Sequence, residues 1–168
     1  MIDVFAARRD KGYGFIDRLM NVTEAMALAD AYAGLPYLAA LPQVDGKRVA
    51  LIGFSYGGMV TTYAAYAMVA KRYAKKDERF AAHVAFYAPC IATFRDNRTT
   101  GAPLLMMYGG KDGIIDPARC KGVAKELEAG GTRVRTVVYP NAYHKWDGSW
   151  GGPYRIGRTL AGCRFVVG

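Results

Sequence analysis

The most constraining feature of this sequence is a regular alternation of short apolar runs with longer stretches of helical composition. Strand-like runs bounded by Gly, Pro or polar residues are Arg48–Gly53, Phe80–Tyr87, Pro103–Gly109 and Arg133–Tyr139. Helical composition fills Val22–Ala33, Gly57–Tyr73 and Pro117–Ala129. Strands separated by helices pair in parallel through right-handed crossovers. The sequence therefore predicts an α/β fold with a mostly parallel sheet and flanking helices.

Local signals refine two of these elements. Thr23 is a good N-cap for the first helix, and Gly34 and Pro36 are expected to bend or end it. The continuous apolar run Arg48–Gly53 is typical of a strand that is covered on both faces.

Composition indicates one globular domain over residues 1–168. Apolar residues make up 52% of the 168 positions and charged residues 22%, which excludes a disordered tail.

No apolar run is long enough to cross a membrane and the N-terminus lacks the order of a signal peptide, so a cytoplasmic location is the default expectation. The net charge of +9 favours anionic small molecules as partners. Its one dense basic run, residues 71–76, has no nucleic-acid motif beside it.

A G-x-S-x-G pattern, residues 53–57, lies between the first apolar run and the next helix. Reversal of the chain within so few residues is expected to force a positive φ on Ser55, and side chains at Gly53 or Gly57 are expected to collide with their neighbours. Such a turn exposes the serine hydroxyl at the carboxyl end of the sheet, near the positive end of a helix. We expect Ser55 to be a nucleophile and the backbone N–H of Tyr56 to be an oxyanion-hole donor.

A serine nucleophile needs a base, and the sequence contains two histidines. His83 lies within a predicted strand and is interpreted as structural, whereas His144 follows the fourth strand and is the predicted base. Asp112, which follows the third strand, is the predicted acid that orients this imidazole. Asp116 is better explained as a helix cap, and Asp147 is a more distant alternative to Asp112.

The predicted Ser, Asp and His all follow parallel strands, so they are expected to meet at one edge of the sheet. Their chain order is that of α/β-hydrolases. The sequence resembles the dienelactone hydrolase-like branch of that superfamily. The segments that carry the resemblance are Asp30–Asp45, Ile52–Gly58, Phe86–Cys90, Pro103–Asp112 and Val138–His144.

The resemblance implies hydrolysis of carboxylic esters or lactones through an acyl-enzyme, with Ser55 as nucleophile, His144 as base and Asp112 as its acid. Dienelactone hydrolases usually carry Cys where this chain has Ser55. The family also has strands before the first helix and draws a second oxyanion-hole donor from a loop there. About twenty residues precede that helix here, without a His-Gly or Gly-Gly loop. We therefore expect a partial α/β-hydrolase fold that is incomplete at the N-terminus, with an unpaired edge on the strand Arg48–Gly53 that could promote self-association.

Two other interpretations remain open: a non-catalytic or truncated α/β-hydrolase remnant, and a basic binding module. Proximity in sequence suggests aromatic walls for a substrate pocket, and surface arginines could meet a substrate carboxylate. The candidates are Phe54, Tyr56, Tyr143 and Trp146 for the walls, and Arg95 or Arg98 for the carboxylate.

The three cysteines, Cys90, Cys120 and Cys163, are interpreted as free buried thiols, although the sequence does not exclude a disulfide between two of them. No Cys/His spacing is typical of a metal site, and we expect no cofactor.

Overall fold

The computed structural model describes every residue except 12–13, 15–16, 18–20, 76–77 and 149–161. Its main sheet has four parallel strands in the order β1-β2-β4-β5, which confirms the predicted α/β class. These strands are β1 (Ala50–Phe54), β2 (Ala82–Phe86), β4 (Leu104–Gly109) and β5 (Val134–Tyr139). A separate parallel pair joins β3 (Ala92–Phe94) to β6 (Phe165–Val167), and neither strand was predicted from the sequence.

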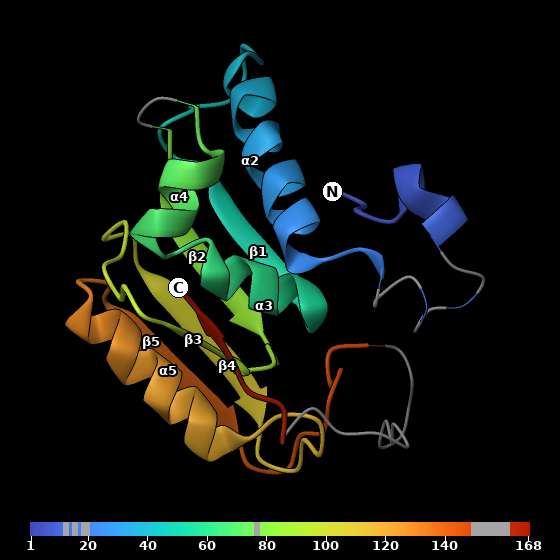
Figure 1. Cartoon of the computed structure of the whole chain (residues 1–168), viewed down its shortest axis with the longest axis vertical. Helices are drawn as coiled ribbons and strands as arrows, with labels where there is room; N and C mark the ends of the chain where they lie inside the picture. The colour runs from blue at the N-terminus through green and yellow to red at the C-terminus, as the bar shows by residue number, and fades with distance from the viewer. Residues whose placement is uncertain (12–13, 15–16, 18–20, 76–77, 149–161) are drawn as a thin grey trace.

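In the view of Figure 1, the α-helices of the described residues lie in front of the main sheet, and the short N-terminal helix lies to its right. A 3-10 helix, η1, precedes four α-helices. Their bounds are Ala6–Lys11 for η1, Glu24–Ala39 for α2, Tyr56–Tyr63 for α3, Ala67–Tyr73 for α4 and Pro117–Ala129 for α5. The core forms between these helices and alternate residues of β2 and β4, among them Ala85, Leu104 and Met106.

The first predicted helix is longer than its sequence suggested. Thr23 caps α2 as expected, since its side chain accepts a hydrogen bond from the Met26 N–H. The expected end at Gly34 or Pro36 is wrong, because α2 continues to Ala39. A proline removes one helical hydrogen bond, but the Pro36 carbonyl still accepts from the Ala40 N–H at 3.1 Å, and burial of Leu35 helps hold this turn.

The predicted helix Gly57–Tyr73 is divided into α3 and α4. Tyr66 has extended backbone angles and forms an isolated antiparallel bridge with Thr99. The Ala67 N–H donates to the Arg98 carbonyl at 2.9 Å, and the Thr100 N–H donates to the Ala65 carbonyl at 2.9 Å. A loop about 30 residues away in sequence thus takes the hydrogen bonds that would have continued the helix.

Strand β1 is the edge strand of the main sheet, as expected for the run Arg48–Gly53, and within the described residues no strand pairs with its outer edge. The prediction that both faces of this strand are covered is wrong. Gly53 is buried against α3, but Ile52 is 56% exposed and Phe54 is 48% exposed. In the described part of the chain, only one face of β1 is packed under helices. Self-association through this edge stays a prediction.

Helix η1 is attached to α2 by an ion pair. The Arg8 guanidinium donates to both carboxylate oxygens of Asp30, at 2.5 and 2.9 Å. The same guanidinium donates to the Val4 carbonyl at 2.7 Å. The beginning of the chain is therefore held against the helix that packs on α3.

Candidate active site

Ser55 lies between the end of β1 and the start of α3, with φ 52° and ψ −115°. Its N–H donates to the Phe86 carbonyl at 2.9 Å, and its own carbonyl accepts from the Met59 N–H at 2.9 Å. The positive φ expected from the sequence is therefore present, and two backbone hydrogen bonds fix the turn. Position 55 also places the side chain at the N-terminus of α3, where the first backbone N–H groups have no partner within the helix.

The two glycines of the motif, Gly53 and Gly57, differ in whether a side chain would fit at their position. A Cβ at Gly53 would lie 2.0 Å from the Gly57 carbonyl oxygen, so no side chain fits there. A Cβ at Gly57 would meet nothing within 4 Å, so the predicted collision at this position is wrong. The backbone carbonyl of Gly57 lies close to Gly53, but a side chain at position 57 would point into open space. Gly58 is the second sterically required glycine, since its Cβ would lie 2.7 Å from the Phe86 carbonyl oxygen.

The structure brings Ser55, His144 and Asp112 together. His144 Nε2 lies 2.9 Å from Ser55 Oγ, and His144 Nδ1 lies 2.8 Å from Asp112 Oδ2. His144 is 3% exposed and Asp112 is 6% exposed. The second carboxylate oxygen, Asp112 Oδ1, accepts from the Ile114 N–H at 2.9 Å, which fixes the carboxylate in this orientation. A hydroxyl, an imidazole and a carboxylate thus form one hydrogen-bonded chain, in which the imidazole and carboxylate are buried and the Ser55 side chain is partly exposed.

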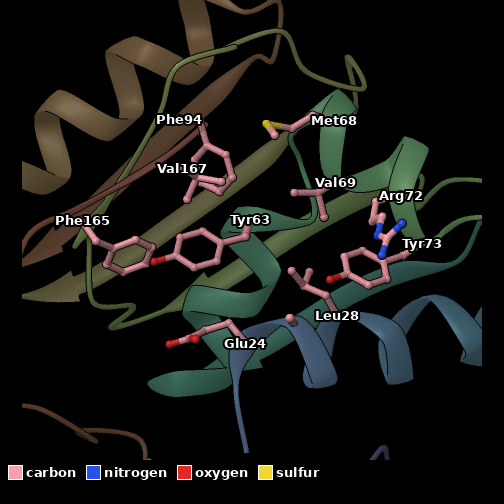
Figure 2. Close-up of a pocket in the computed structure, with 11 residues that line it drawn as sticks. Glu24, Leu28, Tyr63, Met68, Val69, Arg72, Tyr73, Phe94, Phe165 and Val167 are labelled. Atoms are coloured by element: carbon pink, nitrogen blue, oxygen red, sulfur yellow. The ribbon is translucent and has the colours of Figure 1, made fainter.

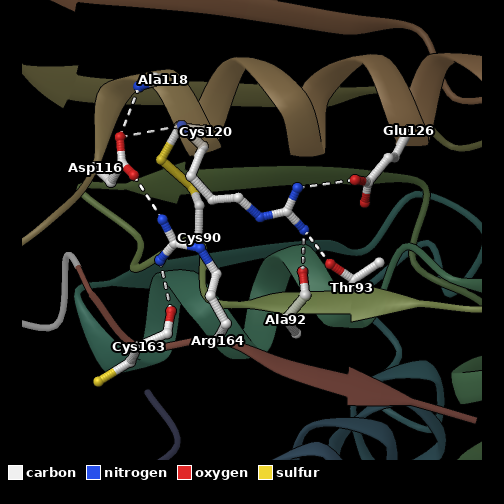
Figure 3. A network of polar contacts seen from close by, with 10 residues as sticks. Cys90, Ala92, Thr93, Asp116, Ala118, Cys120, Glu126, Cys163 and Arg164 are labelled. Atoms are coloured by element: carbon white, nitrogen blue, oxygen red, sulfur yellow. Dashed lines mark hydrogen bonds and ion pairs between the residues drawn. A yellow bond between two sulfur atoms is a disulfide. The ribbon is translucent and has the colours of Figure 1, made fainter.

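The other two aspartates considered for this position have different partners. Asp116 caps α5 by accepting from the Ala118 and Arg119 N–H groups, and it forms an ion pair with Arg164 at 2.7 Å (Figure 3). These hydrogen bonds lower the pKa of the Asp116 carboxyl. Asp147 accepts from the Tyr87 hydroxyl at 2.7 Å.

Sequence reasoning missed Tyr87, which directly follows β2. Its ring centroid lies 4.7 Å from that of His144, and its hydroxyl joins it to Asp147 in the loop that carries His144. Burial, and second the hydrogen bond to Asp147, raise the pKa of Tyr87, so the phenol stays a protonated donor. Its φ of 38° is unusual for a residue with a side chain. The one available signal was its place at the end of a strand, beside Pro89.

The two glycines at the end of β4, Gly109 and Gly110, were also missed. A Cβ at Gly109 would lie 2.2 Å from the Ala142 carbonyl oxygen, and a Cβ at Gly110 would lie 2.7 Å from the Pro140 carbonyl oxygen. The Lys111 N–H donates to the Ala142 carbonyl at 3.0 Å. Backbone contact between the loops that carry Asp112 and His144 therefore requires glycine. A Gly-Gly pair at the end of a strand is the signal that could have indicated it.

The aromatic residues expected to line a substrate pocket have mixed surroundings. The Tyr56 hydroxyl donates to the Val22 carbonyl at 2.8 Å, so its ring is held toward the start of α2. Phe54 stacks on Phe86 with centroids 4.6 Å apart, and Trp146 packs edge-to-face on Tyr87 at 4.9 Å. Tyr143 is 37% exposed. Their role as pocket walls stays a prediction.

The two arginines considered for a substrate carboxylate lie outside this hydrogen-bonded chain. Arg98 forms an exposed ion pair with Asp96 at 2.6 Å, which lowers the pKa of that carboxyl to about 2. Arg95 lies beside the C-terminal residue Gly168, with side-chain atoms 3.7 Å from where a Cβ would stand.

His83 and the cysteines complete the residues that the sequence singled out. His83 is 1% exposed in β2, and burial lowers its pKa to about 4, which fits its structural interpretation.

The interpretation of the cysteines as free thiols is wrong for two of them: Cys90 and Cys120 form a disulfide, drawn in Figure 3. Their Cα atoms lie 5.1 Å apart, which is within bridging range. Cys163 is a free thiol, but it is exposed and not buried.

Two features are absent from the described residues. No group of three or more His, Cys, Asp and Glu side chains there is arranged to hold a metal ion. None of the helices there has both the length and the apolar character that a membrane span requires. The basic run at 71–76 is described only to Lys75, and after Gly148 the described residues resume at Gly162.

A comparison with family models matches residues 6–148 to the dienelactone hydrolase family. The chain belongs to this family. The match includes the turn at Ser55, both loops that carry Asp112 and His144, and every strand of the main sheet.

Among curated dienelactone hydrolase relatives, a protein of Escherichia coli named "Putative carboxymethylenebutenolidase" is 25% identical over 159 residues. That alignment covers 88% of this chain and 54% of the relative. A similar protein of Salmonella typhimurium is 26% identical over 115 residues, covering 63% of this chain and 39% of the relative. The chain thus spans about half the length of the curated relatives it matches.

Solved structures show the same fold. The crystal structure titled "Putative Dienelactone Hydrolase" from Klebsiella pneumoniae has a TM-score of 0.64 and 23% identity, covering 87% of this chain and 62% of that one. An esterase from Thermogutta terrifontis with propionate bound has a TM-score of 0.62 and 17% identity, covering 80% of this chain and 61% of that one. At these identities the structural similarity supports the α/β-hydrolase fold.

Proposed function

We propose that this member of the dienelactone hydrolase family is a serine hydrolase that cleaves carboxylic esters or lactones through an acyl-enzyme. The observation that carries the proposal is the distance of 2.9 Å between Ser55 Oγ and His144 Nε2 at a strand-to-helix turn. A nucleophile and a base at hydrogen-bond distance, with the base oriented by a third group, form the arrangement that activates a serine.

In the acylation step, Ser55 Oγ attacks the carbonyl carbon of the substrate and His144 Nε2 takes the hydroxyl proton. Asp112 accepts a hydrogen bond from His144 Nδ1–H, which selects the tautomer with an unprotonated Nε2 and stabilises the imidazolium that forms. His144 then gives the proton to the leaving alkoxide. For a lactone, that alkoxide remains part of the bound acyl group.

Charge develops on the substrate carbonyl oxygen in this step. The backbone N–H of Tyr56, at the first position of α3, is the donor that we assign to it, because helix-start N–H groups are not used within the helix. Water, deprotonated by His144, then attacks the acyl carbon, and Ser55 regains its proton as the carboxylic acid leaves.

The family and the charge of the chain both support the proposed substrate class. The family name refers to lactone hydrolysis, and the propionate on the Thermogutta esterase supports short acyl groups as substrates. The net charge of +9 favours anionic substrates.

Hydrolysis of p-nitrophenyl acetate and butyrate by the whole chain tests the proposal. We expect saturable release of nitrophenol that falls by more than about 10³-fold in Ser55→Ala, since the nucleophile is lost. Ser55 has no side-chain hydrogen bond that caps α3, so the variant should keep its fold, which circular dichroism checks. Equal rates for both proteins would remove Ser55 from the reaction. A folded but inactive wild-type chain would favour the non-catalytic alternative.

A further inference from the structure

A cavity of about 310 Å³ lies between α2, α3, α4 and the β3–β6 pair. Figure 2 shows its walls, which are mostly apolar: Leu28, Tyr63, Met68, Val69, Phe94 and Val167. Tyr63 ends α3 and Ser55 precedes it, so the rise of a helix separates the two by about 12 Å. The cavity is therefore distinct from the space in front of the Ser55 hydroxyl.

The size and lining of this cavity suit a small ligand with one apolar chain. Small-molecule sites are mostly apolar clefts of roughly 300–1,000 Å³ with a few polar groups that fix orientation. A cavity at the lower end of that range has room for a single alkyl chain but not for a lipid with two chains. The aliphatic and aromatic side chains that line it come from five different elements, α2, α3, α4, β3 and β6.

One side of the cavity carries a single basic side chain. Arg72 of α4 lines it and is exposed, and the neighbouring Lys71 and Lys75 are exposed as well. Among the described residues, Arg72 has no carboxylate within ion-pair distance. Glu24 also lines the cavity, but Figure 2 shows it away from Arg72, on the other side of Leu28. The cavity thus has an apolar body and a cation at one side.

We propose that this cavity binds a medium-chain alkyl carboxylate, with its carboxylate on the Arg72 guanidinium and its chain among Leu28, Val69 and Phe94. The planar guanidinium can donate two parallel hydrogen bonds to a carboxylate. The apolar walls remove the alkyl chain from water. The inference does not depend on the proposed hydrolase activity, because no residue of the Ser55 centre lines this cavity.

Calorimetric titration of the whole chain with decanoate and with decanol tests the site. Both ligands should bind to the Ser55→Ala chain as to the wild type, at one site per chain. Arg72→Gln should weaken decanoate binding about tenfold, as expected for loss of a charge-assisted contact, and leave decanol binding unchanged. Lys71→Gln is the matched control, since Lys71 is also exposed and basic but does not line the cavity; its effect should stay within twofold.

Filling the cavity gives a second test. Val69→Phe should abolish binding of both ligands, and Met68→Phe at the partly exposed rim serves the same purpose if Val69→Phe does not fold.

Equal weakening by Arg72→Gln and Lys71→Gln would overturn the proposal, because it would indicate a diffuse positive field. Loss of binding in Ser55→Ala would place the acid at the catalytic centre. The proposal would also be contradicted if decanoate showed no saturable binding. Arg72-dependent binding to anionic phospholipid vesicles in place of decanoate binding would contradict it as well.

Discussion

His144 Nε2 and Ser55 Oγ lie 2.9 Å apart although their strands, β5 and β1, are at opposite edges of the four-stranded sheet. Three strand spacings, about 14 Å, separate those edges. The loop after β5 therefore has to cross the ends of β4 and β2 to reach β1. It contacts Gly109 and Gly110 at the end of β4, and its Asp147 accepts from Tyr87 at the end of β2.

Replacing Gly109 should displace this loop. Gly109→Ala places a Cβ 2.2 Å from the Ala142 carbonyl oxygen, so His144 should move away from Ser55 and kcat for nitrophenyl butyrate should fall at least about tenfold. Gly113→Ala is the matched control, because a Cβ there meets nothing within 4 Å, and its kcat should stay within about threefold. Similar kcat values for the two variants would show that contact at Gly109 does not position His144.

Two aspartates four residues apart should have separate effects. Asp112→Asn removes the acceptor that selects the His144 tautomer, so kcat should fall by about 10³–10⁴-fold while the fold persists. Asp116→Asn affects the cap of α5 and the ion pair with Arg164, so its kcat should change less than about threefold. Steady-state kinetics and thermal melts of both variants check this. Comparable kcat losses would mean that Asp112 is not specifically the acid.

The disulfide should stabilise the fold. The bond between Cys90 and Cys120 has a sequence separation of 30, and closure of a loop of this size contributes about 3–4 kcal/mol in the chain-entropy account. Urea unfolding of the double Cys90→Ala, Cys120→Ala variant should show a loss of this order. Cys163→Ala, at the exposed free thiol, should unfold like the wild type. A loss that is equal for both variants would contradict the assignment of the pair.

His83 should make the fold sensitive to acid. Burial lowers its pKa to about 4 in the folded chain, against about 6.5 when unfolded, so the unfolded state binds more protons between these values. Stability contributed by neutral His83 is present above pH 6.5 and is lost as the pH falls toward 4, by about 3 kcal/mol in total. Urea unfolding at pH 7 and pH 5 should show a smaller difference for His83→Leu than for the wild type. The same difference in both proteins would show that another group causes the loss.

The sequence predicted elements whose signals are local. Helix α5 has the predicted bounds, because Asp116 supplies its cap, Pro117 its first residue and Gly130 its end. The places of Ser55, Asp112 and His144 at one sheet edge were also predictable, since each residue follows a parallel strand.

Features that depend on distant partners could not be predicted. The break between α3 and α4 depends on backbone bonds from residues 98–100, and the extension of α2 past Pro36 depends on burial of Leu35 in the assembled core. The bond between Cys90 and Cys120 depends on the loop after β2 lying beside the first turn of α5. The exposure of Ile52 and Phe54 on one face of β1 could not be predicted either. The apolar composition of a strand does not tell which of its two faces is packed.

Covalent labelling with a fluorophosphonate, located by peptide mass spectrometry, tests the central claim most directly. An activated serine is required for this reaction, since an ordinary hydroxyl is too weak a nucleophile. We expect one label per chain, on the peptide that contains Ser55, and at least about 10²-fold slower labelling in His144→Gln. A folded chain that remains unlabelled, or a label on another residue with Ser55 unmodified, would contradict the claim that Ser55 and His144 form a catalytic pair.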